Sequence, residues 1–399
     1  MAFQRLSVYP RLPPLDLFDW RFDDAPKTIP PISQSESTWT QPFTISQSLF
    51  HDLLDVKVPV TIAATYLVTV TILNRVNESR QYKPWGFSRT STFKLFVLLH
   101  NILLATFSAW IFYGLFCSLR SCWPSKTEPN FLPRAADSLC RIAGENPPRG
   151  TNFTLGSNHA RYLFQESLLL DANMFALRDS NRLWTTGYAY FSWLFYLSKF
   201  YEVVDTLIIL AKGKRSSMLQ TYHHTGVMFC MWATVRYMSP PGLVGIFFNS
   251  AIHTLMYFYF AWTSLGLPVL RYIKQALTTL QITQFVVGGF IACTYLFIEY
   301  DSLVHRLGDD GQGLPPAITE DMRISSPVPT MSSARGGHDD GFHNHSSRGL
   351  YEVRRTPCLE RSSQAFAVWL TTLYILPLIY LFLCFFNRSY LKRAKSHVK

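Results

Sequence analysis

The sequence predicts an all-α, multi-pass membrane protein with seven transmembrane helices, and three observations lead to that fold class. Only 16% of the 399 residues are charged, against about 25% in soluble proteins. Hydrophobic residues make up 48%, with 31 Phe, 20 Tyr and 10 Trp, whereas disordered chains are poor in aromatic residues. The apolar residues fall into seven runs, most of them near the ~20 residues that cross ~30 Å of hydrocarbon. Seven cysteines are too few, and an odd number, for a fold built on disulfides.

The apolar runs also divide the chain. Residues 1–57 are expected to form a non-cytosolic segment without a signal peptide, because no apolar run follows a basic start. The remaining parts are the first six helices with their loop 118–186 (58–297), a flexible lumenal insert (298–364), the seventh helix (365–387) and a basic cytosolic tail (388–399). The expected spans are 58–73, which is short and Thr-rich, then 93–117, 187–210, 218–237, 243–265, 277–296 and 365–386.

Basic residues predict the orientation. Lys and Arg gather beyond the first, third, fifth and seventh expected spans, for example at Arg75, Lys83, Lys212, Lys214, Arg215, Arg271, Lys274, Arg388 and Lys392. Because cytosolic loops carry the excess of Lys and Arg, the N-terminus is expected to be lumenal and the C-terminus cytosolic. The net charge of +11 then reflects residues flanking membrane helices, and nucleic acid is not expected as a partner.

Two long loops, 118–186 and 298–364, fall on the lumenal side in this topology. The second is rich in Gly, Ser, Pro and Asp, and its middle is expected to be disordered. Its His338, His343 and His345 could hold a metal, but a solvated loop is the favoured interpretation.

The cysteines of the lumenal side suggest a disulfide. Cys122 and Cys140 share the first loop, in a compartment that is oxidising. Cys117 and Cys358 compete for the same pairing, so the partners stay open.

Four Asn-x-Ser/Thr sequons provide a test of the topology, because only lumenal acceptors are glycosylated. Asn152 and Asn344 are expected on the lumenal side, and Asn77 and Asn387 on the cytosolic side. Asn77 is the sharper control, since Asn387 lies close to the membrane.

The third expected span carries charges that are costly inside a bilayer. Lys199, Glu202 and Asp205 are spaced i, i+3, i+6, which puts them along one helix face, and Thr206 follows. Ionisable residues within a membrane are functional candidates by default. Mutual neutralisation of Lys199 and Glu202 is the structural alternative, and a polar cavity is favoured over it.

Histidines add reactive groups to this region. His223 and His224 follow Gln220 at the cytosolic mouth of the fourth span, and an adjacent pair suits metal ligation, acid–base or nucleophilic chemistry. Other polar side chains recur at helical spacing on the second, fifth and sixth spans: His100, Asn101, Ser108, Asn249, His253, Tyr257, Thr278, Gln281 and Gln284. Polar stripes on five helices indicate one shared internal chamber.

These motifs resemble those of the very-long-chain fatty acid elongases, the ELO-type 3-ketoacyl-CoA synthases of the endoplasmic reticulum membrane. The similar positions are Lys199, Glu202, Asp205 and Thr206 (K-x-x-E-x-x-D-T), Asn249, His253, Met256, Tyr257 and Tyr259 (N-x-x-x-H-x-x-M-Y-x-Y), Thr278, Gln281 and Gln284 (T-x-x-Q-x-x-Q), His100-Asn101, and Tyr390-x-Lys392. The resemblance runs from about residue 58 to the C-terminus apart from the two loops. It implies helices two to seven around a central acyl tunnel.

One motif departs from the family pattern. The family's histidine box is commonly H-x-x-H-H, and here Gln220 stands in place of the first histidine. This Q-x-x-H-H form is similar to that of elongases from fungi, plants and algae acting on polyunsaturated chains. Because Gln is neither a base nor a nucleophile, we expect Gln220 to orient other groups. Acyl length and unsaturation stay open.

The resemblance implies that a long-chain acyl-CoA condenses with malonyl-CoA to give 3-oxoacyl-CoA, CO2 and CoA. We expect His223 to accept the acyl group, with His253 beside it and His224 in support. Supporting or substrate-binding roles are expected for Gln220, Lys199, Glu202, Asp205, Thr206, Asn249, Tyr257, Gln281, Gln284, His100 and Asn101. Within this set, Gln220, Asn249 and Gln281 are candidate donors to an enolate, and Lys199 with Arg215 would attract CoA phosphates.

No cofactor or metal is expected beyond the two CoA substrates, and the chain has no G-x-G-x-x-G fingerprint. A ketoacyl-CoA reductase, a dehydratase and an enoyl-CoA reductase are therefore the expected partners for the later steps of the cycle. One alternative is a membrane di-iron desaturase or hydroxylase, which by resemblance needs more histidines than His100, His223, His224 and His253 supply. A seven-helix receptor or a transporter is the other, although no inverted repeat is visible.

Overall fold

The computed structural model describes residues 6–19, 28–31, 38–128, 130–143, 154–155, 161–163, 182–305 and 350–391. Several positions discussed above lie outside these ranges, namely Asn152, His338, His343, Asn344, His345 and Lys392. The chain forms two compact units, and each is described by itself.

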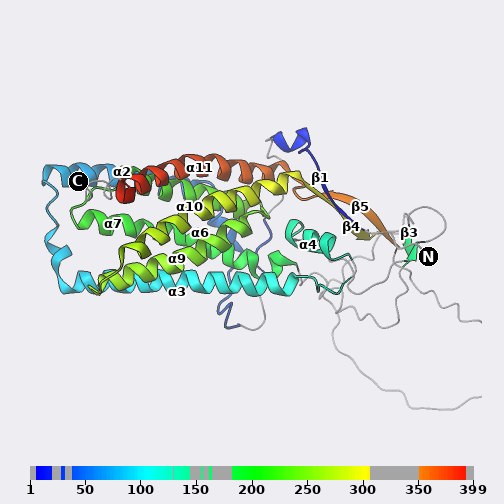
Figure 1. Ribbon diagram of the computed structural model, residues 1–399, viewed down its shortest axis with the longest axis horizontal. Coiled ribbons are helices and arrows are strands. Elements are labelled where there is room, and N and C mark those ends of the chain that lie inside the picture. The colour runs from blue at the N-terminus through cyan, green and yellow to red at the C-terminus, as the bar shows by residue number, and fades with distance from the viewer. Residues whose placement is uncertain are drawn as a thin grey trace, which may run out of the picture. The chain divides into compact units, whose positions relative to one another are not determined.

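The larger unit (Arg5–Gly150, Leu169–Ser302 and Arg355–Lys399) contains long helices that run side by side (Figure 1). They are α2 (Lys57–Ser79), α3 (Ser91–Cys122), α6 (Ala189–Tyr201), α7 (Val203–Ala211), α8 (Met218–Arg236), α9 (Gly242–Ser264), α10 (Arg271–Thr294) and α11 (Ser362–Phe386). The shorter helices and turns are η1 (Leu15–Phe18), α1 (Gln47–Asp52), η2 (Gly86–Arg89), α4 (Phe131–Cys140), η3 (Trp184–Tyr188), η4 (Tyr295–Phe297) and η5 (Asn387–Leu391).

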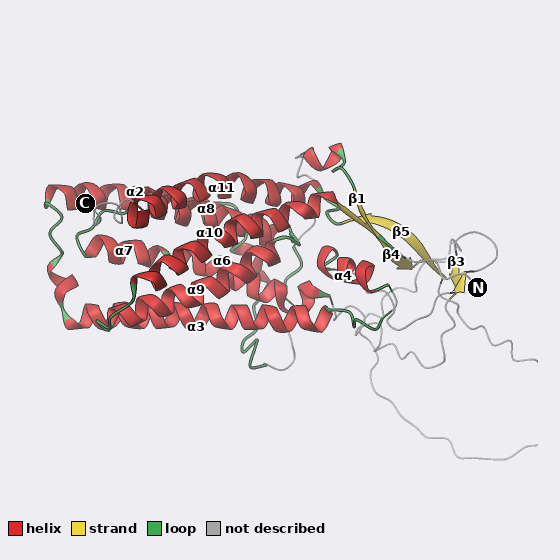
Figure 2. Cartoon of the chain, viewed as in Figure 1, coloured by secondary structure: helices red, strands yellow, loops and turns green. Residues whose placement is uncertain are grey.

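Six of these helices form a ring in which each helix contacts the next. Helix α3 packs on α9, α9 on α10, α10 on α11, α11 on α8, α8 on α6, and α6 returns to α3. Helix α2 contacts α7 and α8 and takes no part in that ring. Figure 2 shows this bundle as the helical part of the fold. The second to seventh predicted helices therefore surround a common centre, and the first lies outside them.

Five helices among the described residues are long and apolar enough to cross a membrane: Lys57–Ser79, Ser91–Cys122, Gly242–Ser264, Arg271–Phe297 and Ser362–Leu391. A helical, multi-pass membrane protein is thereby confirmed. Their outward side chains include Leu99, Leu103, Leu373 and Leu376, which are more than half exposed, as lipid-facing residues would be.

The third and fourth predicted spans are not among the helices that are long and apolar enough to cross a membrane. The third is split into α6 and α7, because the helix is interrupted at Glu202. The fourth, α8, carries the polar Gln220, His223 and His224. In α6 every residue from 189 to 196 is buried, so this helix faces other helices rather than lipid and needs no continuous apolar surface.

Short strands modify the all-α expectation. In the larger unit, β1 (Val8–Pro10) pairs antiparallel with the first residues of β4 (Ile298–His305). In the smaller unit (Met1–Gln4, Thr151–Leu168 and Leu303–Arg354), β3 (Arg161–Leu163) pairs antiparallel with β2 (Thr154–Leu155) and with the start of β5 (Leu350–Pro357). The predicted flexible insert 298–364 therefore begins with a strand, β4, and contains a second one, β5, before α11 starts at Ser362.

Cys140 at the end of α4 and Cys358 after β5 form a disulfide. The pairing of Cys122 with Cys140 is thus wrong, and Cys358, its competitor, is the partner. Cys122 instead lies within α3 with its Sγ 3.4 Å from Thr186 Oγ1. Sequence alone left this choice open because 218 residues separate the bridged cysteines.

Buried polar contacts also tie α4 to other segments of the larger unit, beside the Cys140–Cys358 disulfide. Arg182 donates to the carboxylate of Asp137 at 2.6 Å, and the hydroxyl of Tyr300 donates to it at 3.2 Å. Burial, followed by the neighbouring Asp137 charge, raises the pKa of Tyr300. We call α4, the β1–β4 pair and the Cys140–Cys358 disulfide the cap.

Asn77 is a weaker glycosylation control than the sequence suggested. Its side chain is fully buried at the end of α2. Its Nδ2 donates to the carbonyls of Leu210 (2.8 Å) and Lys214 (3.3 Å), and its Oδ1 accepts from Trp85 Nε1 (2.9 Å). A glycan would break these bonds, so the absence of one on Asn77 follows from the fold in either orientation.

Candidate active site

The helices enclose a cavity of about 510 Å³, which we call the polar chamber. Side chains from α3, α7, α8, α9, α10 and α11 line it together with Glu202. The predicted site residues among its lining are Asn101, Glu202, Asp205, Gln220, His223, His224, His253, Tyr257, Gln281 and Gln284. Residues from five separate predicted motifs thus meet around one space.

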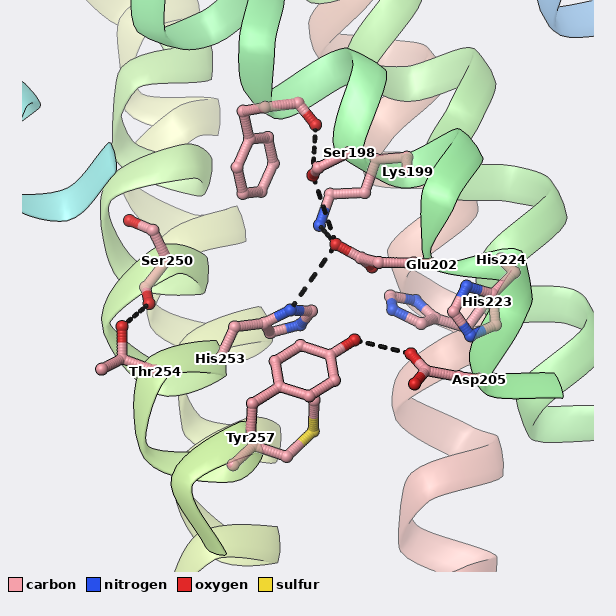
Figure 3. Close-up of polar contacts among 12 residues, drawn as sticks. Ser198, Lys199, Glu202, Asp205, His223, His224, Ser250, His253, Thr254 and Tyr257 are labelled. Atoms are coloured by element: carbon pink, nitrogen blue, oxygen red, sulfur yellow. Dashed lines mark hydrogen bonds and ion pairs between the residues drawn. The ribbon is translucent and has the colours of Figure 1, made fainter. Parts of the chain in front are cut away.

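Glu202 lies at the break between α6 and α7, at the centre of the charged stripe (Figure 3). Its Oε1 accepts from Lys199 Nζ at 2.6 Å and from Ser198 Oγ at 3.3 Å. His253 Nδ1 lies 4.0 Å from the same oxygen. The carboxylate therefore joins a lysine one turn back along the chain to a histidine on α9.

Lys199 is 1% exposed, with its ammonium 3.9 Å from the centre of the Phe195 ring. It does not line the chamber, and it makes the neutralising pair with Glu202 that the sequence offered as an alternative. Because a buried charge is costly unless it is paired, each member of this ion pair needs the other in the folded protein. A contact of Lys199 with CoA phosphates stays a prediction.

Asp205, one turn beyond Glu202, connects three helices. Its two oxygens lie 2.8 Å from His100 Nε2 and 2.6 Å from the hydroxyl of Tyr257, which donates to it. The other nitrogen of His100 lies 3.1 Å from the hydroxyl of Tyr201. Asp205 thus holds α3 and α9 against α7 and fixes one wall of the chamber.

Gln220 contacts both His224 and Thr206 through its side-chain amide. Its Nε2 donates to His224 Nε2 at 2.8 Å and to Thr206 Oγ1 at 3.4 Å, and Thr206 in turn lies 3.0 Å from the hydroxyl of Tyr66. Gln220 thus ties His224 on its own helix to Thr206 on α7. The geometry agrees with an orienting role for Gln220.

His223 has a different partner from His224. Its Nδ1 lies 2.7 Å from the hydroxyl of Tyr374 on α11. Its ring centre is 5.4 Å from that of His224. The two adjacent histidines consequently face different sets of residues across the same helix.

Several polar atoms of the site have no hydrogen-bond partner among the described residues, namely Glu202 Oε2, His224 Nδ1, Asn249 Oδ1, His253 Nδ1 and Gln284 Oε1. Buried polar atoms are nearly always satisfied in native proteins, by protein, water or ligand. Four of these five atoms belong to residues that line the polar chamber, namely Glu202, His224, His253 and Gln284.

A second, smaller cavity of about 90 Å³ also has His223 in its lining, and we call it the apolar passage. It shares His223, Gln284 and Phe285 with the polar chamber. The rest of its lining is mostly apolar or small, including Val227, Met231, Phe248, Gly245, Gly288, Gly289, Ala292, Val368 and Ile375. Apolar and polar compartments therefore meet at one histidine.

Not every predicted motif residue reaches the chamber. Thr278 points to Tyr390, with 3.2 Å between their hydroxyl oxygens, and also donates to the carbonyl of Lys274. Gln281 lines the chamber, where its Nε2 contacts Met256 Sδ at 3.1 Å. The T-x-x-Q-x-x-Q box thus combines a packing contact with two chamber residues.

Sequence reasoning missed three residues of the site, Tyr66, Tyr201 and Tyr374, whereas Lys212 belongs to the basic stretch expected to attract CoA phosphates. The tyrosines stand in apolar segments, where an aromatic residue is ordinary. Lys212 lines the chamber at the end of α7, and partial burial, then the neighbouring Lys214, lower its pKa. Its place in the basic stretch after the third span was the available signal.

The profile of the GNS1/SUR4 family (ELO) matches residues 53–398, most of the chain. The chain belongs to this family. The structure agrees with that match in detail, because the motif residues of five separate segments gather around one chamber. Membership in this family does not support the alternative functions considered above, namely a desaturase or hydroxylase, a receptor and a transporter.

The chain is also similar to individual proteins that are named as fatty acid elongases. The chain is 31% identical over 125 residues to "Fatty acid elongase 2" of Trypanosoma brucei brucei, covering 31% of this chain and 46% of that protein. It is 32% identical over 155 residues to "Fatty acid elongase sre1" of Dictyostelium discoideum (38% and 56%), and 37% identical over 101 residues to "Very long chain fatty acid elongase 7" of Rattus norvegicus (24% and 35%). The matched segments span about half the length of the first two relatives.

Proposed function

We propose that the protein is a fatty acid elongase that condenses a long-chain acyl-CoA with malonyl-CoA to give 3-oxoacyl-CoA, CO2 and CoA. The observation that carries this proposal is the meeting of the polar chamber and the apolar passage at His223. A thioester whose carbonyl lies at that junction has its polar CoA portion on one side and its hydrocarbon tail on the other. The membership in the GNS1/SUR4 family and the names of the relatives support it.

In the first half of the reaction, an imidazole nitrogen of His223 attacks the thioester carbonyl and expels CoA, which leaves an acyl-imidazole. In the second half, malonyl-CoA loses CO2 and its carbanion takes the acyl group from the histidine. Nucleophilic catalysis of this kind divides one difficult step into two easier ones. His224, Gln220 and Asp205 keep the surrounding walls in place through the hydrogen bonds described above.

The enolate-like carbanion needs donors that are already in position. Gln281 and Gln284 line the chamber on α10, opposite His253 on α9, and Asn249 lines the passage one turn before His253. The pair of Glu202 with Lys199 lies beside His253, with Glu202 Oε1 4.0 Å from His253 Nδ1. Lys212, which lines the chamber, and Arg215 are the proposed basic residues for CoA phosphates, because Lys199 is buried against Glu202.

We propose seven membrane spans, with α6 and α7 together as the third and α8 as the fourth. The C-terminal end of α11 is cytosolic and the cap is lumenal in this topology. The Cys140–Cys358 disulfide supports it, since disulfides persist in oxidising compartments. The membrane is that of the endoplasmic reticulum, as the family resemblance implies.

No cofactor takes part in the proposed condensation. The ketoacyl product must then be reduced, dehydrated and reduced again by separate enzymes, for which ketoacyl-CoA reductase, dehydratase and enoyl-CoA reductase are the proposed partners. The chain has no G-x-G-x-x-G sequence of its own.

The test is product formation in membranes that contain the protein. A panel of saturated, monounsaturated and polyunsaturated acyl-CoAs is supplied with isotopically labelled malonyl-CoA, without reduced nicotinamide cofactor. We expect labelled 3-oxoacyl-CoA two carbons longer than the accepted substrate. Absence of malonyl-dependent product with every acyl-CoA, from folded protein, would refute the proposal.

A further inference from the structure

Tyr374 makes two contacts with one residue, His223. Its hydroxyl oxygen lies 2.7 Å from His223 Nδ1 and 3.2 Å from the backbone carbonyl oxygen of the same residue. The tyrosine comes from α11 and the histidine from α8, 151 positions apart in the chain. No predicted motif includes Tyr374.

The position of one proton follows from these two contacts. A tyrosine hydroxyl has a single hydrogen to donate, and a carbonyl oxygen only accepts. Both bonds form together only when Tyr374 donates to the carbonyl and accepts from Nδ1–H of the imidazole. The ring is then neutral with its proton on Nδ1, so the lone pair lies on Nε2.

The tyrosine ring is held tightly in this place. It stacks on Tyr222 with ring centres 5.5 Å apart, and the Tyr222 hydroxyl donates to the backbone carbonyl of Tyr374 at 3.1 Å. On α8 the ring approaches Gly226 so closely that a Cβ there would lie 2.3 Å from Tyr374 Cε2. Glycine is unfavourable inside a helix, and at Gly226 the close approach of this ring accounts for it.

We propose that Tyr374 is a positioning residue that holds His223 in the Nδ1–H tautomer and thereby leaves Nε2 as the acyl acceptor. This inference rests on the proposed function. Nε2 forms the bond to the acyl carbon, and the C–S bond breaks with its electron pair leaving on the CoA sulfur. The acyl-imidazolium keeps its Nδ1 proton in the hydrogen bond to Tyr374. When the malonyl-derived carbanion takes the acyl group, the Nε2–C electron pair returns to nitrogen.

The opposite tautomer is the competing state that Tyr374 disfavours. With the proton on Nε2, that nitrogen has no free lone pair and cannot attack a thioester. Tyr374 would then donate to Nδ1 and lose its bond to the carbonyl. The second contact of the hydroxyl therefore favours the reactive form of the ring.

The test compares Tyr374→Phe with Tyr380→Phe. The first keeps the ring stacked on Tyr222 and beside Gly226 but removes the hydroxyl. The second removes a hydroxyl from the same helix at a side chain that is 67% exposed and outside both cavities. Purified protein in detergent is mixed with acyl-CoA alone, and the acyl adduct is followed by intact mass and by release of free CoA.

We expect Tyr374→Phe to slow adduct formation about tenfold, the size of effect that one lost hydrogen bond accounts for. The affinity for acyl-CoA should stay within about twofold, because the bond acts on the reacting nitrogen and not on uniform binding. Tyr380→Phe should form the adduct at the wild-type rate. An adduct rate in Tyr374→Phe equal to wild type would overturn the proposal.

A second measurement reads the tautomer without turnover. Nitrogen NMR of protein labelled with ¹⁵N-histidine, assigned with His223→Ala, should show a protonated Nδ1 and a bare Nε2 at His223, and a mixture in Tyr374→Phe. A wild-type ring protonated on Nε2 would overturn the inference even if the protein condenses its substrates. Absence of all malonyl-dependent product from wild type would instead defeat the proposed function.

Discussion

The polar chamber and the apolar passage share His223, but substitutions in their linings should have different effects. The chamber, about 510 Å³, has carboxylates, histidines and amides among its lining, some of them linked by short hydrogen bonds, together with apolar side chains. The passage, about 90 Å³, is lined mostly by apolar side chains and by glycines, of which Gly245, Gly288 and Gly289 have open surroundings. A change in the chamber therefore alters the chemistry for every substrate, whereas a change in the passage alters which acyl chain fits.

The strongest test of the chamber is His223→Ala. Removal of the proposed acyl acceptor should lower 3-oxoacyl-CoA formation by about 1000-fold or more for all acyl-CoAs, in the range known for loss of an enzymatic nucleophile. The measurement is the initial rate with labelled malonyl-CoA at saturating acyl-CoA.

A matched control is His51→Ala, because His51 is exposed on α1 and lines neither cavity. It should retain the wild-type rate. Substantial turnover by His223→Ala would mean that another group accepts the acyl chain.

A smaller loss is expected for Glu202→Gln. The change removes the charge that pairs with buried Lys199 and that lies 4.0 Å from His253. Loss of a positioned acid–base partner should lower turnover about 100-fold. It should also destabilise the protein by about 3–5 kcal/mol, since one buried charge is left without its partner. Rate assays and thermal unfolding in detergent measure the two effects.

The double variant Lys199→Met with Glu202→Gln separates these contributions. We expect it to recover most of the lost thermal stability, because no unpaired buried charge remains, while turnover stays low. Recovery of both stability and turnover would show that the pair serves folding alone.

Gly288→Leu tests the passage. Gly288 is buried on α10, yet a Cβ added there would meet no atom within 4 Å, so a larger side chain occupies the passage without a backbone clash. Each excluded methylene forfeits about 0.8 kcal/mol of burial, so kcat/KM should fall about tenfold for each two-carbon extension of the longest accepted chains. Shorter acyl-CoAs should react at wild-type rates.

The control for that change is Gly86→Leu. Gly86 also has open surroundings, but it lies in η2 and lines neither cavity. Its profile of product lengths should equal that of wild type. An equal fall in kcat/KM for acyl-CoAs of every length in Gly288→Leu would contradict the assignment of the passage to the acyl tail.

The difference between the two cavities also explains what could be predicted from sequence. Lys199, Glu202, Asp205, His223 and His253 were identifiable because ionisable residues are rare in membrane helices. Their common chamber followed from helical spacing, and the structure confirms that Glu202, Asp205, His223 and His253 line it.

The passage and its boundary were not predictable in the same way. Tyr374 and Gly288 are of residue types that are ordinary in membrane helices, so neither departs from its apolar neighbours in the sequence. The partner of Cys140 lay 218 residues away, and the break at Glu202 occurs where the sequence has neither Pro nor Gly. Such features arise from long-range contacts that periodicity does not contain.

The smallest effect on chemistry is expected at the cap, where Cys140→Ser and Cys358→Ser remove the disulfide together. Val368 lines the passage and packs in the same cluster as both cysteines, so the cap supports the passage wall without contacting the chamber. Opening so long a loop should cost about 2–4 kcal/mol of stability. The rate with short acyl-CoAs should stay within about twofold, because the hydrogen bonds around His223 are untouched. Thermal unfolding and the initial rate below the melting temperature measure the two. A large loss of rate in the folded double variant would show that chamber and cap act as one unit, and the separation of chemistry from chain selection would then be wrong.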